Sequence, residues 1–160
     1  MIFYECYADQ ALLVFLGFNS RDLKGGHSFG RSNVCSKLKK LGNSVGMIDE
    51  DPNSTQDAYL KYLSSLRTDY EDQYLIHITD KKLGNKLIVL RPNLEWLLLK
   101  IARDKKVDLS TFNLSNSEGE IHDRLRLQNH TRERSRMVEF VRAHEDHRAI
   151  TKLKEFAKSL

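Results

Sequence analysis

The fold of this chain is decided by residues 45–52, which read Val-Gly-Met-Ile-Asp-Glu-Asp-Pro. The short apolar run at 45–48 predicts a buried strand, because a strand covered on both faces has no polar side. Acidic residues follow this run at once. The sequence therefore predicts carboxyl groups directly at the carboxyl end of a buried strand.

Predicted strands and helices alternate around this stretch. A run of β-forming residues at 2–7 is followed by helical patterns at 10–18 and 32–41, with Gly42 as a C-terminal stop. After the 45–48 strand, a helix is expected over 56–66 and two strands over 74–78 and 86–90, which flank a Gly-Asn turn. Such alternation predicts an α/β fold with a central, mostly parallel sheet flanked by helices.

The pattern changes after residue 90. Pro92 suits the first turn of a helix with an apolar inner stripe, and residues 110–130 are mostly polar and predict irregular structure. Two further helices, one around Phe140 and one around Leu153, close the chain. We therefore expect an α/β core over 1–90 and a helical C-terminal extension over 91–160, packed together as one compact domain.

Acidic side chains gather near the ends of two predicted strands. Glu5 and Asp9 stand at the junction of the first strand and the first helix, and Asp49 and Asp51 follow the 45–48 strand. Ligand sites in open α/β sheets lie at the carboxyl ends of strands, so neighbouring strands would bring these groups together. Carboxylates in one pocket raise one another's pKa unless a cation compensates them. The sequence therefore predicts a site for Mg²⁺ or Mn²⁺, which suits phosphoryl chemistry.

The spacing of these acids resembles the Toprim domain of topoisomerases, primases and, most closely, OLD-type nucleases. That family has a glutamate after its first strand and an Asp-x-Asp pair after its third, which bind Mg²⁺ on a Rossmann-like sheet. By this resemblance Glu5 is the general acid/base and a metal ligand, Asp49 and Asp51 are catalytic metal ligands, and Asp9 is a supporting acid. The resemblance covers residues 1 to about 90.

The resemblance implies a Mg²⁺-dependent nuclease that acts on nucleic acid, DNA first of all. OLD-type modules work with an ATPase, so an ATPase partner in phage defence or DNA repair is expected. The alternative is a catalytically weak or inactive Toprim-shaped subunit that docks to an ATPase or to nucleic acid. Cys6 favours this alternative because it stands where the family has glycine. A third interpretation is a flavodoxin-like signalling domain whose phospho-acceptor is Asp49 or Asp51.

Several of these acids also have simpler interpretations. Asp9 is suited to cap the first helix, and the acidic residues at 49–51 are typical of a surface turn. Glu95 follows a strand and a proline, so it is either a further metal ligand or an exposed acid that the helix dipole favours.

Charge is divided unevenly along the chain of 160 residues. Residues 1–80 hold 8 basic and 11 acidic side chains, and residues 81–160 hold 18 and 11. The basic second half suits a phosphate backbone. The candidate phosphate-binding residues are Arg31 and Ser32, at the entry to a helix, and Lys81, Lys82 and Arg91.

Other classes of protein are excluded by what the sequence lacks. Its longest apolar runs, such as 11–16, are too short to cross a membrane, and its first residues do not resemble a signal peptide. Cys6 and Cys35 provide neither a disulfide framework nor a zinc site. We therefore expect a cytoplasmic protein with no membrane partner, and the sequence leaves a homo-oligomer open.

Overall fold

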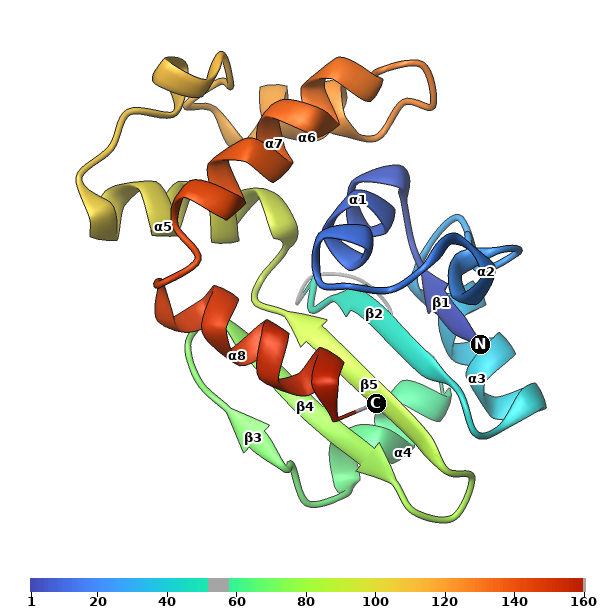
Figure 1. Ribbon diagram of the computed structural model, residues 1–160. Helices are drawn as coiled ribbons and strands as arrows, with labels where there is room; N and C mark the ends of the chain where they lie inside the picture. The colour runs from blue at the N-terminus through green and yellow to red at the C-terminus, as the bar shows by residue number, and fades with distance from the viewer. Residues whose placement is uncertain (52–57, 160) are drawn as a thin grey trace.

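A mixed five-stranded sheet forms the centre of the protein, whose computed structural model describes residues 1–51 and 58–159 (Figure 1). β1, β2 and β5 are parallel, whereas β4 is antiparallel to both of its neighbours, so the expected α/β fold with a mostly parallel sheet is confirmed. In space the strands follow the order β1 (Ile2–Tyr4), β2 (Val45–Asp49), β5 (Asn85–Leu90), β4 (Leu75–Asp80) and β3 (Tyr70–Glu71).

The register of the parallel strands decides what meets at their carboxyl ends. Tyr4 of β1 pairs with Met47 of β2, and Asp49 of β2 pairs with Leu90 of β5. Glu5, which follows β1, is therefore placed at the same edge of the sheet as Asp49.

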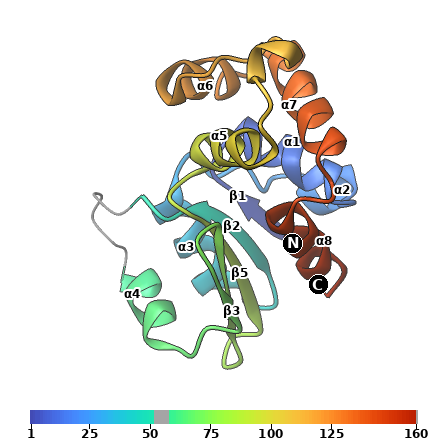
Figure 2. The ribbon, with the colours of Figure 1, turned by 90° about the vertical axis from the view of Figure 1, so that its left-hand side faces the viewer.

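Helices cover both faces of the sheet (Figure 2). One layer contains α3 (Arg31–Leu41) and α4 (Ala58–Ser65). The other layer and the helical part that continues from it contain α1 (Tyr7–Phe15), α2 (Ser20–Leu23), α5 (Leu94–Lys105), the 3₁₀ helix η1 (Leu109–Phe112), α6 (Glu118–Leu125), α7 (Thr131–Ala143) and α8 (Arg148–Lys158).

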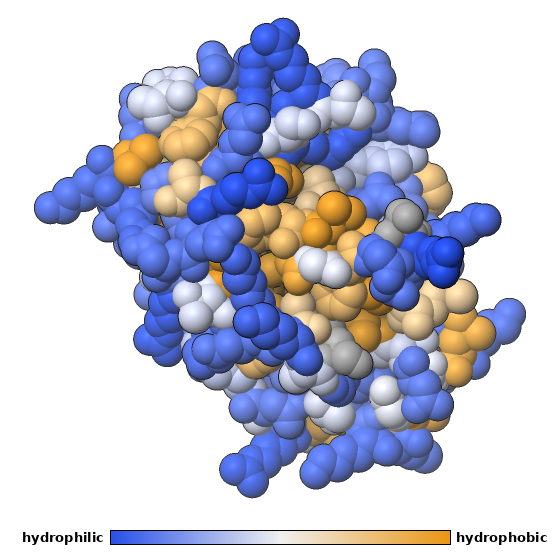
Figure 3. Space-filling model, in the orientation of Figure 1, coloured by the Kyte–Doolittle hydropathy of each residue, from blue (hydrophilic) through white to orange (hydrophobic). Residues whose placement is uncertain are grey.

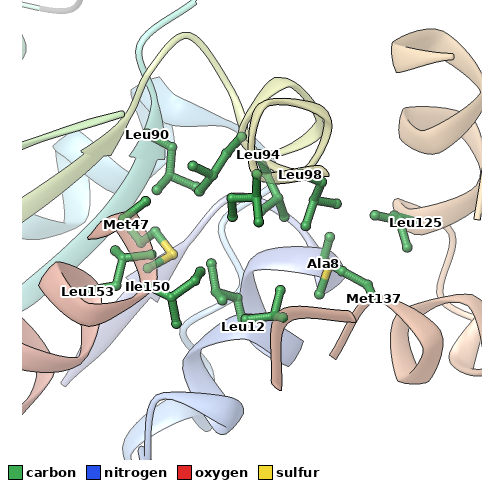
Figure 4. Close-up of a cluster of buried hydrophobic side chains, with 14 of the residues drawn as sticks. Ala8, Leu12, Met47, Leu90, Leu94, Leu98, Leu125, Met137, Ile150 and Leu153 are labelled. Atoms are coloured by element: carbon green, nitrogen blue, oxygen red, sulfur yellow. The ribbon is translucent and has the colours of Figure 1, made fainter. Parts of the chain in front are cut away.

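Successive strand residues face opposite layers, because side chains alternate along a strand. Phe3 and Ile48 pack with the α3–α4 layer. Tyr4 and Met47 pack with the other. Side chains of the C-terminal helices join this second core, as Leu98 of α5 and others show in Figure 4. The helical extension and the α/β part therefore share one buried apolar cluster.

A groove lined by both apolar and polar side chains lies between α1 and α7. Ala11, Val14 and Phe15 of α1 face Val138 of α7 across a hollow of about 560 Å³. Apolar side chains gather near the centre of the face shown in Figure 3.

Several elements differ from the prediction. Helix α1 begins at Tyr7 because the first strand ends early, at Tyr4. Pro92 lies before α5 and not in its first turn, since the side chain of Asn93 caps that helix by accepting the N–H of Trp96 at 2.7 Å. The predicted helix over 56–66 is seen from residue 58, and residues 56–57 lie outside the described ranges.

Residues 110–130 are not irregular as predicted, because they contain most of η1 and all of α6. Helix α6 buries Ile121 and Leu125, which are four residues apart, and this signal is too sparse to indicate a helix. The two-residue strand β3 was also not predicted. Among the helices of residues 1–51 and 58–159, none is long and apolar enough to span a membrane.

Candidate active site

Four carboxyl groups come together at the carboxyl edge of the sheet. Glu5 follows β1, Asp49 ends β2, and Asp9 and Glu95 lie in the first turns of α1 and α5. They line two adjoining cavities of about 630 and about 460 Å³. Glu5, Asp49 and Glu95 line both, and Asp9 lines the smaller. The expected convergence of Glu5, Asp9 and Asp49 is therefore present, and Glu95 belongs to the same group.

Asp9 is held in place by the backbone at the start of α1. It is 3% exposed, and its Oδ2 accepts the N–H groups of Glu5 at 3.1 Å and Cys6 at 2.9 Å. Cys6 is the N-cap residue, so Asp9 is not the N-cap but the acidic member of a capping box, reaching back from the first turn. These bonds also fix the backbone that positions Glu5.

The side chains of Glu5 and Asp49 link the ends of β1 and β2 to the start of α5 through two hydrogen bonds. Oε1 of Glu5 accepts the N–H of Asp49 at 2.8 Å, which joins the ends of β1 and β2. Oδ1 of Asp49 accepts the N–H of Leu94, the first residue of α5, at 3.1 Å. The positive end of the α5 dipole therefore points at the Asp49 carboxylate.

Glu95 is buried beneath helix α6. It is 6% exposed, and its Oε1 lies 2.9 Å from Nδ1 of His122. The interpretation of Glu95 as an exposed first-turn acid is therefore wrong, although it does lie in the first turn. The cause is α6, the helix that the sequence did not predict.

The surroundings of Glu5, Asp9 and Asp49 favour their protonated forms. Burial, followed by the charges of Asp9, Glu5 and Glu95, raises the pKa of Asp49 to about 9. Burial, and then the charge of Glu5, raises the pKa of Asp9 to about 7. Burial also raises the pKa of Glu5, against the opposing effects of the Asp49 amide and of Arg31. At neutral pH, bound protons therefore reduce the negative charge of the cluster, and a bound cation would reduce it in the same way.

The donor chemistry of the cluster suits a hard divalent cation. Among the residues that the structure describes, no group of three or more His, Cys, Asp or Glu side chains is already arranged as a metal-ligand set. Glu5, Asp49 and Glu95 nevertheless present carboxylate oxygens to a shared cavity, and carboxylate oxygen is the ligand type that Mg²⁺ prefers. One hydrogen bond does not exhaust a carboxylate, which has about four lone-pair sites. These residues therefore fit an Mg²⁺ or Mn²⁺ ion.

Asp51 lies apart from Asp49, although both line the larger cavity. Strand β2 ends at Asp49, and Asp51 adopts a left-handed conformation with φ of 38°. Its N–H donates to the carbonyl of Pro92 at 3.1 Å. Asp49 and Asp51 therefore do not form a pair on one extended strand, and Asp51 is an exposed residue at the cavity.

The side chain of Arg31 is buried and binds the turn that follows β2. It is 7% exposed, and its Nη1 donates to the carbonyls of Glu50 and Asp51. These two bonds engage only Nη1, and Arg31 also lines the larger cavity, so a phosphate contact by its other donors stays a prediction. Ser32, the second residue of α3, is exposed and lines the larger cavity as expected for a phosphate contact.

The remaining basic candidates lie at different edges of the sheet. Arg91 follows β5 near the site, but its guanidinium pairs with Glu50 at 2.9 Å and Glu71 at 2.7 Å. Lys81 and Lys82 lie in the turn between β4 and β5. Strand β5 runs from that turn toward the site, so both lysines lie at the opposite edge of the sheet (Figure 1). They therefore lie away from the carboxyl cluster, and a contact with nucleic acid that extends beyond the cluster stays a prediction.

Other residues of the site were missed by sequence reasoning. His122 lines both cavities from α6, within the segment that was predicted to be irregular, and Asn93 lines the larger one from the cap of α5. Phe29, which is 76% exposed, lines both cavities as well. No periodicity or motif marks these positions, because their roles depend on how distant elements pack.

Comparisons with protein-family models, curated proteins and solved structures found no match to this chain. Interpretation of the site therefore depends on its geometry and chemistry.

Proposed function

We propose that the protein is a Mg²⁺- or Mn²⁺-dependent enzyme that hydrolyses or transfers phosphodiester bonds of nucleic acid. The convergence of Glu5, Asp9, Asp49 and Glu95 at one edge of the sheet carries this proposal. Burial, and then the charges of neighbouring carboxyl groups, raise the pKa values of Asp9 and Asp49, which creates a preference for a compensating cation. The Toprim-like order of Glu5 and Asp49 along the chain points to the same chemistry.

In this proposal the carboxyl groups have different roles. Glu5 is the general acid/base, because its raised pKa brings it closer to neutral pH and it lines both cavities. Asp49 and Glu95 hold the cation together with Glu5, while Asp9 fixes the turn that presents Glu5. The bound ion would neutralise phosphate charge and assist the attacking and leaving oxygens.

Anion-binding groups around the two cavities would bind the phosphate backbone of the substrate. Ser32 stands in the first turn of α3, where backbone N–H groups favour an anion. Arg126, whose side chain is about half exposed, lines the smaller cavity. The basic second half of the chain agrees with a polyanionic substrate. An ATPase partner rests on the Toprim resemblance.

A non-catalytic subunit of the same shape is the second candidate. Cys6 favours this candidate, because its half-buried side chain occupies the turn between Glu5 and Asp9, where the Toprim family that the chain resembles has glycine. Burial raises the pKa of the Cys6 thiol well above its usual range, so this side chain is a neutral group that provides no thiolate ligand.

Cleavage assays separate the two candidates. Supercoiled and linear DNA, and RNA of matching sequence, are incubated with the protein in Mg²⁺, in Mn²⁺ and in EDTA. We expect metal-dependent cleavage that Glu5→Gln and Asp49→Asn each reduce at least about 100-fold, the size of a general acid/base contribution. Asp22→Asn is the matched control, because it removes an exposed acid on α2, outside the residues that line the two cavities.

Absence of cleavage by the wild-type protein in all metals, with nucleic acid still bound, would favour the non-catalytic subunit. Equal cleavage by wild type and Asp49→Asn would contradict the role of the carboxyl cluster.

A further inference from the structure

Three aromatic side chains form a ledge beside the carboxyl cluster. The ring of His27 contacts the rings of Tyr7 and Phe29, with centroid distances of 4.3 and 4.0 Å. We call Tyr7, His27 and Phe29 the aromatic ledge. The catalytic roles proposed above make no use of these rings.

Phe29 is held in an unusual state for a large apolar residue. Its side chain is 76% exposed, although an aromatic ring usually contributes to stability by being buried. Its backbone has φ of 53°, in the left-handed region that bulky residues seldom adopt. Neither its exposure nor its conformation is explained by core packing. A flat apolar face is thereby kept available at the rim of the site.

The ledge forms one side of the smaller cavity, of about 460 Å³. Glu5 and Asp49 line this cavity as well, together with Leu127, which is 44% exposed, and Arg126. Arg126 contacts Asp123 at 3.7 Å on its own helix. A planar apolar group in the cavity would thus lie against aromatic and aliphatic side chains, with carboxyl groups and a cationic group close by.

We propose that the aromatic ledge stacks an unpaired nucleobase, so that the substrate of this site is single-stranded nucleic acid. This inference rests on the proposed function, since it specifies the substrate of the same site. Aromatic side chains stack on bases of any sequence, because every base has a π-face. In a duplex those faces are already covered by neighbouring base pairs, and the ledge has access to them in single strands, frayed ends or flipped nucleotides.

The placement of the ledge also brings the phosphates of a stacked nucleotide toward the carboxyl cluster. A base on the ledge would put the phosphates attached to its own nucleotide near Glu5 and Asp49, which line the same cavity. Arg126 lines the same cavity and would contact a phosphate of the same strand. The ledge would therefore position the strand without reading its sequence.

Binding measurements without cleavage test the ledge directly. Fluorescence anisotropy with a labelled 12-nucleotide single strand, a duplex of the same length and an abasic strand is recorded in EDTA and again in Ca²⁺. We expect Phe29→Ala to weaken binding of the base-carrying strand about five- to a hundredfold, as loss of one stacked base predicts. The abasic strand should bind wild type and variant alike.

Two matched variants separate stacking from apolar bulk. Phe29→Tyr keeps an aromatic ring and should bind like the wild type, whereas Phe29→Leu keeps apolar bulk and should bind like Phe29→Ala. Thermal unfolding followed by circular dichroism is the folding control, and it should change little because the Phe29 ring is mostly exposed.

The proposal is overturned if the wild type fails to bind the single strand, binds the duplex as tightly, or if Phe29→Leu retains full affinity. Failure of the proposed function looks different: base-dependent binding then persists while no cleavage occurs in Mg²⁺ or Mn²⁺. Conversely, metal-dependent cleavage that is unchanged in Phe29→Ala would retain the nuclease and remove the ledge.

Discussion

Replacing Asp49 with asparagine should stabilise the metal-free protein, and more so as the pH rises. In the folded chain the pKa of Asp49 is raised from 3.8 to about 9, first by burial and then by neighbouring carboxyl groups. Between pH 5 and 8 the folded state therefore keeps a proton on Asp49 that the unfolded state has lost. Because the folded state binds more protons, the free energy of unfolding of the wild type falls as pH increases.

The size of the effect follows from this one proton. One proton corresponds to about 1.4 kcal/mol per pH unit, so the Asp49 contribution falls by up to about 4 kcal/mol between pH 5 and 8. Asparagine has the shape of the protonated carboxyl group, retains an oxygen for the Leu94 N–H, and does not titrate. The pKa of Asp9 should be similar in both proteins, since protonated Asp49 and asparagine are both neutral. Asp9 therefore contributes equally to the two pH profiles. The variant should therefore show a flatter pH dependence than the wild type.

Urea unfolding in EDTA at pH 5, 6, 7 and 8, followed by circular dichroism, measures this difference. Asp108→Asn is the matched control, because hydrogen bonds from Asn116 and Ser110 hold the pKa of Asp108 below its usual value. Asp108 is ionised in both the folded and the unfolded state throughout this range, and these two partners do not titrate, so its variant should run parallel to the wild type. A parallel profile for Asp49→Asn would refute the reasoning about the cluster.

Three further predictions follow from contacts in the structure. Arg31→Ala should lower the free energy of unfolding by about 1–3 kcal/mol in urea, because two backbone carbonyls beside β2 lose their buried donor. Gly46→Ala should lower it by about 1–3 kcal/mol, since the new methyl group would lie 2.7 and 2.8 Å from two leucine carbons. Gly119→Ala in α6 meets no atom within 4 Å and should instead raise it by about 0.5–1 kcal/mol; equal effects of the two glycine variants would contradict this packing argument. The double variant Lys81→Ala and Lys82→Ala should leave nucleic-acid affinity within about twofold in an anisotropy titration, because both lysines lie at the opposite edge of the sheet, and a large loss would contradict that placement.

The pattern of strands and acids was enough to predict which edge of the sheet carries the site. The apolar run at 45–48 and the β-rich start of the chain both end in acidic residues, and parallel strands bring such ends together. The pairing of β1 with β2 then places Glu5 beside Asp49. This part of the prediction depended on local periodicity, which sequence carries well.

The remainder depended on contacts between distant parts of the chain. The burial of Glu95 could not be predicted, because it depends on packing with α6, a helix with a weak apolar pattern. The contact of Arg31 with the turn after β2 could not be predicted, because nothing local indicates that its side chain reaches that turn. The placement of Lys81 and Lys82 had an available signal, since the predicted Gly-Asn turn joins two strands as a hairpin. Such a turn lies at the edge opposite the carboxyl end of its second strand.

The contact between Glu95 and His122 has a consequence for dissecting the protein into fragments. A fragment of residues 1–90 would retain Glu5, Asp9 and Asp49, yet it would lack the fourth acid and the helices that shield the cluster from water. Its carboxyl groups would be hydrated, their pKa values would return toward ordinary ones, and the demand for a compensating ion would weaken. The chemistry of this site is thus a property of the whole chain, and cannot be transplanted by grafting its α/β half onto another scaffold.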